Sequence, residues 1–142
     1  MADPTAIARD FFESWNRRDW SHYRELMHKD YSYTGGDGKA QPGAEAGLAV
    51  AQVFANAFPD GRIEPDKIHA CGDNVVIAEF VGRGTHKGDL MGMAPTGRHV
   101  AINVCDVLEF RDGKIIAERE YMDMMAMMQQ LGLAPAETTA TA

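Results

Sequence analysis

The feature that most constrains the fold is a change in hydrophobic periodicity near residue 60. Before this point, apolar residues recur at helical spacing, as Ile7, Phe11 and Trp15 do. This spacing predicts helices over 4–16, 20–27 and 44–58. After this point, β-rich runs separated by turn signals predict strands over 62–71, 75–86, 98–110 and 114–122. Helices followed by hairpin-linked strands predict an α+β fold, in which a cone-shaped, curved antiparallel sheet wraps around the N-terminal helices.

The rest of the chain fits one domain over residues 1–132 and a flexible C-terminal tail over 133–142. Residues 31–34 are a short strand candidate, and 87–97 form a loop or mobile crossing segment. Pro65 interrupts its strand, which favours an edge strand or a bulge. A sheet that wraps around a helix leaves a cone with an open mouth, and such a mouth is a natural pocket for a small molecule.

Charge and composition exclude several classes of partner. The formal net charge is −7 and the pI is about 5.1, which disfavours a nucleic acid backbone or an anionic membrane as partner. The sequence has no apolar run long enough to span a bilayer and no N-terminal signal core, so we expect a cytoplasmic protein. A small hydrophobic molecule is the expected partner. No CxxC or HExxH pattern predicts a metal site.

The stretch EFRDGKIIAEREYMD, residues 109–123, carries acids at nearly every second position of a predicted strand. A turn with a left-handed Gly113 and a bulge would place Asp106 opposite Glu118, with Glu120 one pair further on. In this register the three acids share one face of the sheet. We prefer this register to the alternative described next.

A simpler two-residue turn at Asp112 and Gly113 changes the outcome. It places Glu120 with Cys105 and Val107, on the face opposite to Asp106. In that case the acids of the last strand form a charged stripe on a solvated surface. Asp106 would then need another partner, such as an arginine or a lysine.

In the preferred register, the acids face a cavity lined by apolar residues that include Leu108 and Ile116. Burial raises the pKa of a carboxyl group, and a like-charged neighbour raises it further. One acid then holds a proton near neutral pH while another is ionised. We predict Glu120 as the general acid/base and Asp106 as its partner, for removal of a proton next to a carbonyl group.

Other residues are weaker candidates. His86 has the strand parity of Phe80 and is an auxiliary catalytic candidate near the mouth, although a surface position is the alternative. Methionines in the crossing loop suit an adaptable pocket wall, and aromatic residues suit its floor, with core packing as the alternative for each. The predicted substrate-binding set is Trp15, Tyr33, Phe54, Phe80, Met91, Met93, Leu108, Glu118 and Met122.

Three motifs, GTHKGDLMG, PTGRHV and FRDGKI followed by the acidic strand, resemble the SnoaL-like polyketide cyclases of the nuclear-transport-factor-2-like superfamily. The resemblance runs from ARDFFESWNRRD to MMQQLG. It implies a homodimer that uses no cofactor and no metal, and that closes a polyketide ring by intramolecular aldol condensation. It places the family's catalytic acid, often Asp after Trp, at Glu120, and the family's histidine at Asp106. The chain departs from the family pattern at both positions.

These observations lead to three hypotheses. The first is a cofactor-independent cyclase or isomerase that acts by acid/base chemistry on a hydrophobic, carbonyl-containing, polyketide-like substrate. The second is an epoxide or ester hydrolase on the same fold, in which paired carboxylates activate water. The third is a protein without catalytic activity that binds a hydrophobic metabolite, or that binds a partner through the outer face of the sheet. Because one fold hosts all three, the site has to decide between them.

Overall fold

The computed structural model describes residues 3–135, which form one α+β unit. Residues 136–142 of the predicted tail lie outside the described residues. The elements in chain order are α1 (Pro4–Asn16), α2 (Trp20–Glu25), β1 (Met27–Thr34), β2 (Ala40–Pro42), α3 (Ala44–Ala57), β3 (Arg62–Cys71), β4 (Val75–Thr85), β5 (His99–Arg111), β6 (Lys114–Met122) and α4 (Met124–Gln130).

Local capping chemistry explains where the N-terminal helices begin. The Asp3 carboxylate accepts a hydrogen bond from the Thr5 backbone N–H at 3.0 Å, and Pro4 occupies the first position of α1. Asp19 caps α2 in the same way. The apolar face of α1 then buries Phe11 and Phe12, which anchor the helix against the sheet.

The six strands form one curved sheet in the order β2-β1-β6-β5-β4-β3. The sheet is mixed, because β1 runs parallel to β6 while all other neighbours are antiparallel. The predicted all-antiparallel sheet is therefore wrong at this pair, and β2 was not predicted. β3 is an edge strand whose register shifts after Pro65, as the proline predicts.

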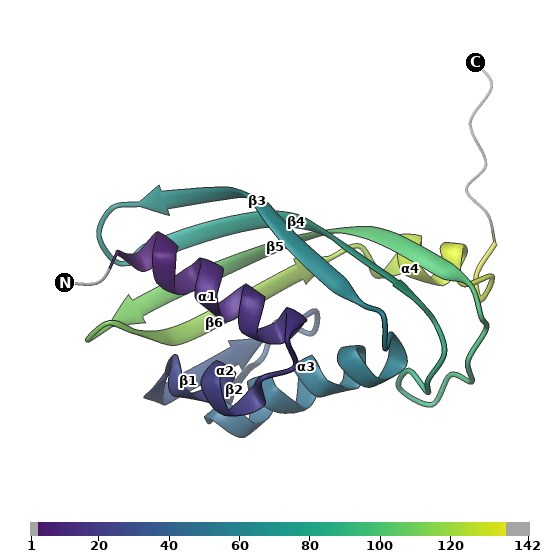
Figure 1. The fold of residues 1–142 in the computed structure, drawn as a ribbon, viewed down its shortest axis with the longest axis horizontal. Coiled ribbons are helices and arrows are strands. Elements are labelled where there is room, and N and C mark those ends of the chain that lie inside the picture. Colours follow the sequence, from purple (N-terminus) through teal and green to yellow (C-terminus); the bar gives the residue numbers. More distant parts are fainter. Residues whose placement is uncertain (1–2, 136–142) are drawn as a thin grey trace, which may run out of the picture.

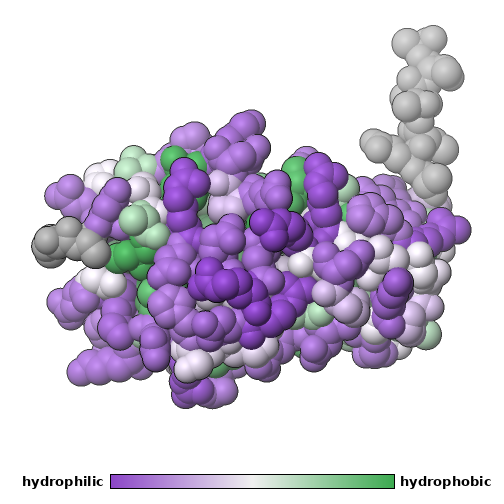
Figure 2. Space-filling view, viewed as in Figure 1, coloured by the Kyte–Doolittle hydropathy of each residue, from purple (hydrophilic) through white to green (hydrophobic). Residues whose placement is uncertain are grey.

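The helices cover the concave side of this sheet. Figure 1 shows α1 crossing the long strands while α3 runs below them. Between these layers lies the core, which includes Phe11, Tyr31 and Leu108, all at most 1% exposed. The face seen in Figure 2 is mostly hydrophilic, with small hydrophobic patches. Among the helices of residues 3–135, none is long and apolar enough to cross a membrane.

Candidate active site

The β5–β6 hairpin sets the direction of every acid on its two strands. Its turn has two residues, Asp112 and Gly113, with φ angles of 53° and 73°. Two positive φ angles define the tight turn whose twist matches a hairpin. Directly after the turn, Phe110 pairs with Ile115, and then the register shifts by one residue.

This shift is a bulge at Ile116, and it changes the pairing that the sequence suggested. Beyond the bulge, Leu108 lies opposite Glu118 and Asp106 lies opposite Glu120. Both predicted registers are wrong in detail. The turn has two residues, which excludes the preferred register, and a bulge inside β6 then shifts the pairing away from the simpler alternative. The bulge nevertheless restores the face that the preferred register predicts for the acids. The preferred register predicted that Ile116 faces inward. Because of the bulge, Ile115 is the fully buried isoleucine, and Ile116 is only partly buried.

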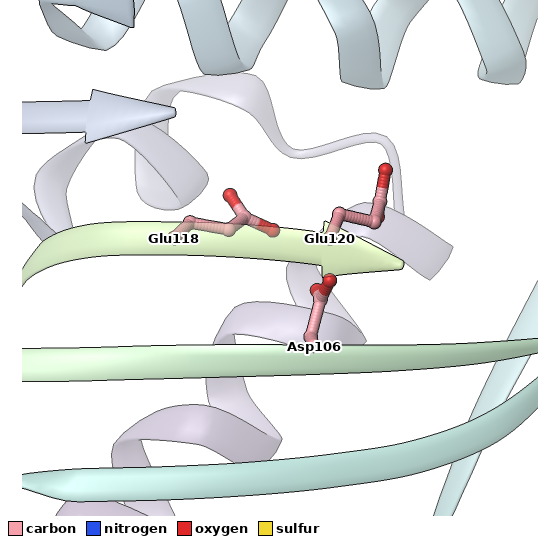
Figure 3. Close-up of side chains that lie close together, drawn as sticks. All are labelled: Asp106, Glu118 and Glu120. Atoms are coloured by element: carbon pink, nitrogen blue, oxygen red, sulfur yellow. The ribbon is translucent and has the colours of Figure 1, made fainter. Parts of the chain in front are cut away.

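Three carboxyl groups therefore meet on the concave side of the sheet. Glu118 and Glu120 rise from β6, and Asp106 reaches toward them from β5 (Figure 3). Each contributes a carboxylate oxygen, and the three oxygens lie within 4.8 Å of one another. Asp106 is 1% exposed and Glu118 is 3% exposed, whereas Glu120 is partly open to the cavity.

Two tyrosines of β1 hold the glutamates. The Tyr31 hydroxyl donates a hydrogen bond of 2.6 Å to Glu118 Oε1, and the Tyr33 hydroxyl donates one of 2.9 Å to Glu120 Oε1. The parallel pairing of β1 with β6 brings these side chains to the same face. Sequence reasoning named Tyr33 but missed Tyr31. The alternation in YSYT could have identified Tyr31, because residues two apart on a strand point to the same face as each other.

A glycine makes room for the Tyr31 ring. A Cβ atom at Gly47 of α3 would lie 2.8 Å from both Cε1 and Cζ of Tyr31, closer than real Cβ atoms approach other atoms. The absence of a side chain at Gly47 thus lets the phenol pass under α3 and reach Glu118. A side chain at Gly47 of α3 would therefore disturb the hydrogen bond between Tyr31 and Glu118.

Burial and mutual repulsion raise the pKa values of the three acids. Burial raises the pKa of Asp106 well above its usual range, and the charges of Glu120 and Glu118 raise it further. Burial and the charge of Glu118 raise the pKa of Glu120 to about 7, against the lowering effect of the hydrogen bond from Tyr33. Burial also raises the pKa of Glu118, but hydrogen bonds with Asp106 and Tyr31 oppose that rise. Burial therefore raises the pKa of every member of the cluster, and hydrogen bonds from the two tyrosines oppose the rise at the glutamates.

The acids lie at the wall of a large apolar cavity. It contains about 770 Å³ of space free of protein atoms, counted out to its open mouth. Asp106, Glu118 and Glu120 are its acidic lining residues. Of the predicted substrate-binding set, the cavity is lined by Trp15, Tyr33, Phe54, Phe80, Glu118 and Met122.

The other four predicted site residues are not among the lining residues of this cavity. The His86 ring is fully buried beside Phe58, 5.5 Å between centroids, and its Nδ1 accepts a hydrogen bond from the Thr96 backbone N–H at 3.2 Å. Met91 is 58% exposed, and Met93 is partly buried against the core. Leu108 is fully buried in the core. The structure thus does not bring His86 to the acid cluster.

The same three carboxylates offer the oxygen ligands that hard cations prefer. Within the described part of the chain, Asp106 Oδ1 is buried without a hydrogen-bond partner. Protons compete for this cluster, because the raised pKa values of all three acids disfavour the ionised form that binds a cation. The arrangement suits a site that moves protons between a carboxylate and a bound neutral molecule.

Comparisons with known proteins agree with this geometry. The family model for the SnoaL-like polyketide cyclases matches residues 5–131. The chain is 31% identical over 134 residues to aklanonic acid methyl ester cyclase AcmA of Streptomyces galilaeus, which covers 93% of this chain and 92% of the relative. It is 34% identical over 83 residues to nogalonic acid methyl ester cyclase of Streptomyces nogalater, which covers 58% of this chain and 61% of that relative.

Solved structures share the fold. IdmH of Streptomyces antibioticus is 29% identical and superposes with a TM-score of 0.81, over 92% of this chain and 99% of IdmH. A SnoaL-like protein from Jannaschia sp. CCS1 is 21% identical, with a TM-score of 0.83 over 92% of both chains. The second likeness concerns the fold alone. Both agree with a single α+β unit built from helices and a curved, unclosed sheet.

Proposed function

Since the chain belongs to the SnoaL-like polyketide cyclase family, we propose that it closes a ring in a neutral, hydrophobic, polyketide-like substrate by acid/base chemistry, without a cofactor or a metal. The observation that carries this proposal is the position of three buried or half-buried acids on the wall of one apolar cavity. The pKa of Glu120 is raised to about 7, where a general base works best, and burial raises the pKa of Asp106 well above its usual range, which suits a proton donor.

The proposed reaction divides the work between these two acids. The Glu120 carboxylate removes a proton from a carbon next to a carbonyl group, which leaves an enolate. The enolate carbon attacks a second carbonyl carbon in the same molecule, so that a carbon–carbon bond forms and the second carbonyl oxygen gains charge. Asp106 donates its proton to that oxygen and is reprotonated from Glu120. The reaction neither adds nor removes atoms or electrons, so the product is an isomer of the substrate.

Glu118 lines the same cavity and acts on this pair. Its charge raises the pKa of Glu120, and its hydrogen bond from Tyr31 keeps it in place. The three acids also disfavour a carboxylate in the same space, because like charges in a dry site repel strongly. A substrate whose reacting end is uncharged, such as an ester or a ketone, suits the cavity.

Ring closure of aklanonic acid methyl ester tests the proposal, since the 31% identical relative is named for this compound. We expect wild-type protein to form the cyclised isomer, equally well after dialysis against a chelator. Glu120→Gln is expected to bind the ester and lose turnover. The matched control is Glu25→Gln, which changes an exposed glutamate of α2 that pairs with His22. Turnover that survives in Glu120→Gln, or oxygen from labelled water in the product, would contradict the acid/base cyclase.

The same proposal includes a homodimer formed through the outer face of the sheet. Tyr121 lies there, 58% exposed, in a shallow hollow that also includes Glu79 and Cys105. We expect light scattering to find a dimer that Tyr121→Glu weakens. Met91→Glu is the control, because Met91 is equally exposed but lies outside this hollow. A monomeric wild-type protein, or equal effects of the two changes, would contradict the proposed interface.

A further inference from the structure

β4 carries two glycines on its concave side, and they have different surroundings. Val76, Ala78 and Phe80 point inward along this strand, so the alternation brings Gly82 and Gly84 to the same face. Neither has a positive φ angle, and so the backbone does not require glycine at either position. A glycine inside a strand lowers stability and often marks close approach by another backbone or by a ligand.

Gly84 is explained by the approach of another segment of the protein. A Cβ atom there would lie 2.9 Å from Phe58 Cβ and 3.2 Å from Gly61 Cα. The segment that follows α3 therefore packs directly on the backbone of β4. A side chain at this position would push the two apart.

Gly82 has no such neighbour. The nearest atoms to a Cβ at this position are Ile102 Cγ1 at 3.9 Å and the Cγ2 atoms of Ile63 and Val104 at 4.0 Å. These are ordinary van der Waals distances. Gly82 pairs with Ile63 on one side and with Ile102 on the other, so it forms a notch in a row of branched side chains. This notch is part of the wall of the apolar cavity.

We propose that Gly82 determines the size of the ring system that the cavity accepts. The ligand class is a flat, uncharged polycyclic ketone or ester, which lies on the backbone of β4 at the notch. Aromatic side chains of α1 and α3, among them Trp15 and Phe54, line the same cavity. This inference rests on the proposed function for the identity of the ligand, but it concerns binding and needs no turnover.

Three flat aryl methyl ketones of increasing size test it: acetophenone, 2-acetonaphthone and 2-acetylanthracene. Their dissociation constants are measured from methyl NMR shifts on the wild type, Gly82→Ala and Gly82→Val. We expect Gly82→Val to weaken the binding of 2-acetylanthracene roughly tenfold, as overpacking does, and that of acetophenone by less than about twofold. Gly82→Ala is expected to give a smaller change of the same kind, which keeps the test decisive if the valine variant does not fold.

Stability separates a binding role from a structural one. An alanine at Gly82 removes the cost of a strand glycine without a clash, so its melting temperature is expected to rise by roughly 2–4 °C. Gly84→Ala is the matched control, since its Cβ meets Phe58. It is expected to lower the melting temperature, because the segment that carries Phe58 has to move away from β4.

Several outcomes would overturn the inference. These are an equal loss of affinity for all three ketones, an unchanged size preference, a fall in melting temperature for Gly82→Ala, or no binding of any of the three by the wild type. A failure of the proposed cyclase has a different signature. In that case the esters do not cyclise, while the size preference of the wild type still depends on Gly82.

Discussion

The hydrogen bond from Tyr33 to Glu120 gives the sharpest prediction for the acid cluster, through the change Tyr33→Phe. The phenol donates to the ionised carboxylate at 2.9 Å and so lowers the pKa of Glu120 against the effect of burial. A hydrogen bond to a charged group contributes about 1.5–3 kcal/mol, which corresponds to roughly 1–2 pKa units. Without it, we expect the pKa of Glu120 to rise from about 7 by that amount.

The pH dependence of kcat/KM for ring closure measures this shift. Glu120 must be ionised to act as a base, so the rate rises with pH through its pKa. Tyr33→Phe is expected to move that midpoint upward by about 1–2 pH units and to lower the rate at pH 7 roughly tenfold. The rate recovers at high pH, because the base is still present. A midpoint that stays in place or moves down would refute this reasoning.

Tyr31→Phe is the matched control, with an effect of opposite sign. The hydrogen bond from Tyr31 lowers the pKa of Glu118 against the effect of burial, and the charge of Glu118 raises the pKa of Glu120. Without the Tyr31 hydroxyl, Glu118 takes up a proton more readily and repels Glu120 less. The midpoint is therefore expected to move down, if it moves at all. Equal upward shifts in both variants would mean that the two tyrosines do not act on separate glutamates.

Three further predictions concern stability. The pKa of Glu120 is about 7 in the fold against 4.5 for a free glutamate, so the free energy of unfolding falls as pH rises through this window. Relative to the wild type, Glu120→Gln is expected to gain about 2–3 kcal/mol in the free energy of urea unfolding at pH 8 and nothing near pH 4. Gly47→Ala forces the Tyr31 ring away from Glu118 and is expected to cost about 1–3 kcal/mol in the same assay, whereas Gly36→Ala, with open space around it, should be neutral. Asp123 caps α4 through the Ala126 N–H, so Asp123→Ala is expected to cost about 1 kcal/mol in thermal unfolding, and an unchanged melting temperature would remove that role.

Sequence patterns predicted the three N-terminal helices and the four C-terminal strands, because these depend on local periodicity. Glu118 and Glu120 are two residues apart on one strand, so any register puts them on the same face. The position of Asp106 depended on the pairing of β5 with β6. The bulge at Ile116 decided this pairing, and the nearest glycine, Gly113, belongs to the turn and does not mark the bulge.

Local sequence patterns did not predict which distant strands pair or how far each contact extends along a strand. The parallel contact of β1 with β6 joins residues more than 80 positions apart, and it alone brings Tyr31 to Glu118. His86 was predicted from the parity of β4, but the strand ends at Thr85. His86 keeps the inward direction that the parity predicts, but its ring packs beside Phe58. Ala78 is the β4 residue that pairs with Asp106, and His86 lies eight residues further along, roughly 26 Å away at the usual rise of a strand.

The measurement that most directly tests the central claim is a carbon-13 NMR titration of the side-chain carboxyl groups, assigned with Glu120→Gln, Glu118→Gln and Asp106→Asn. We expect a midpoint near 7 for Glu120. We also expect Asp106 to remain protonated when Glu120 ionises, because burial raises its pKa well above the usual range. Midpoints for all three acids in the ordinary range of about 3.9–4.3 would show that the cluster is solvated, and this result would contradict the proposed chemistry.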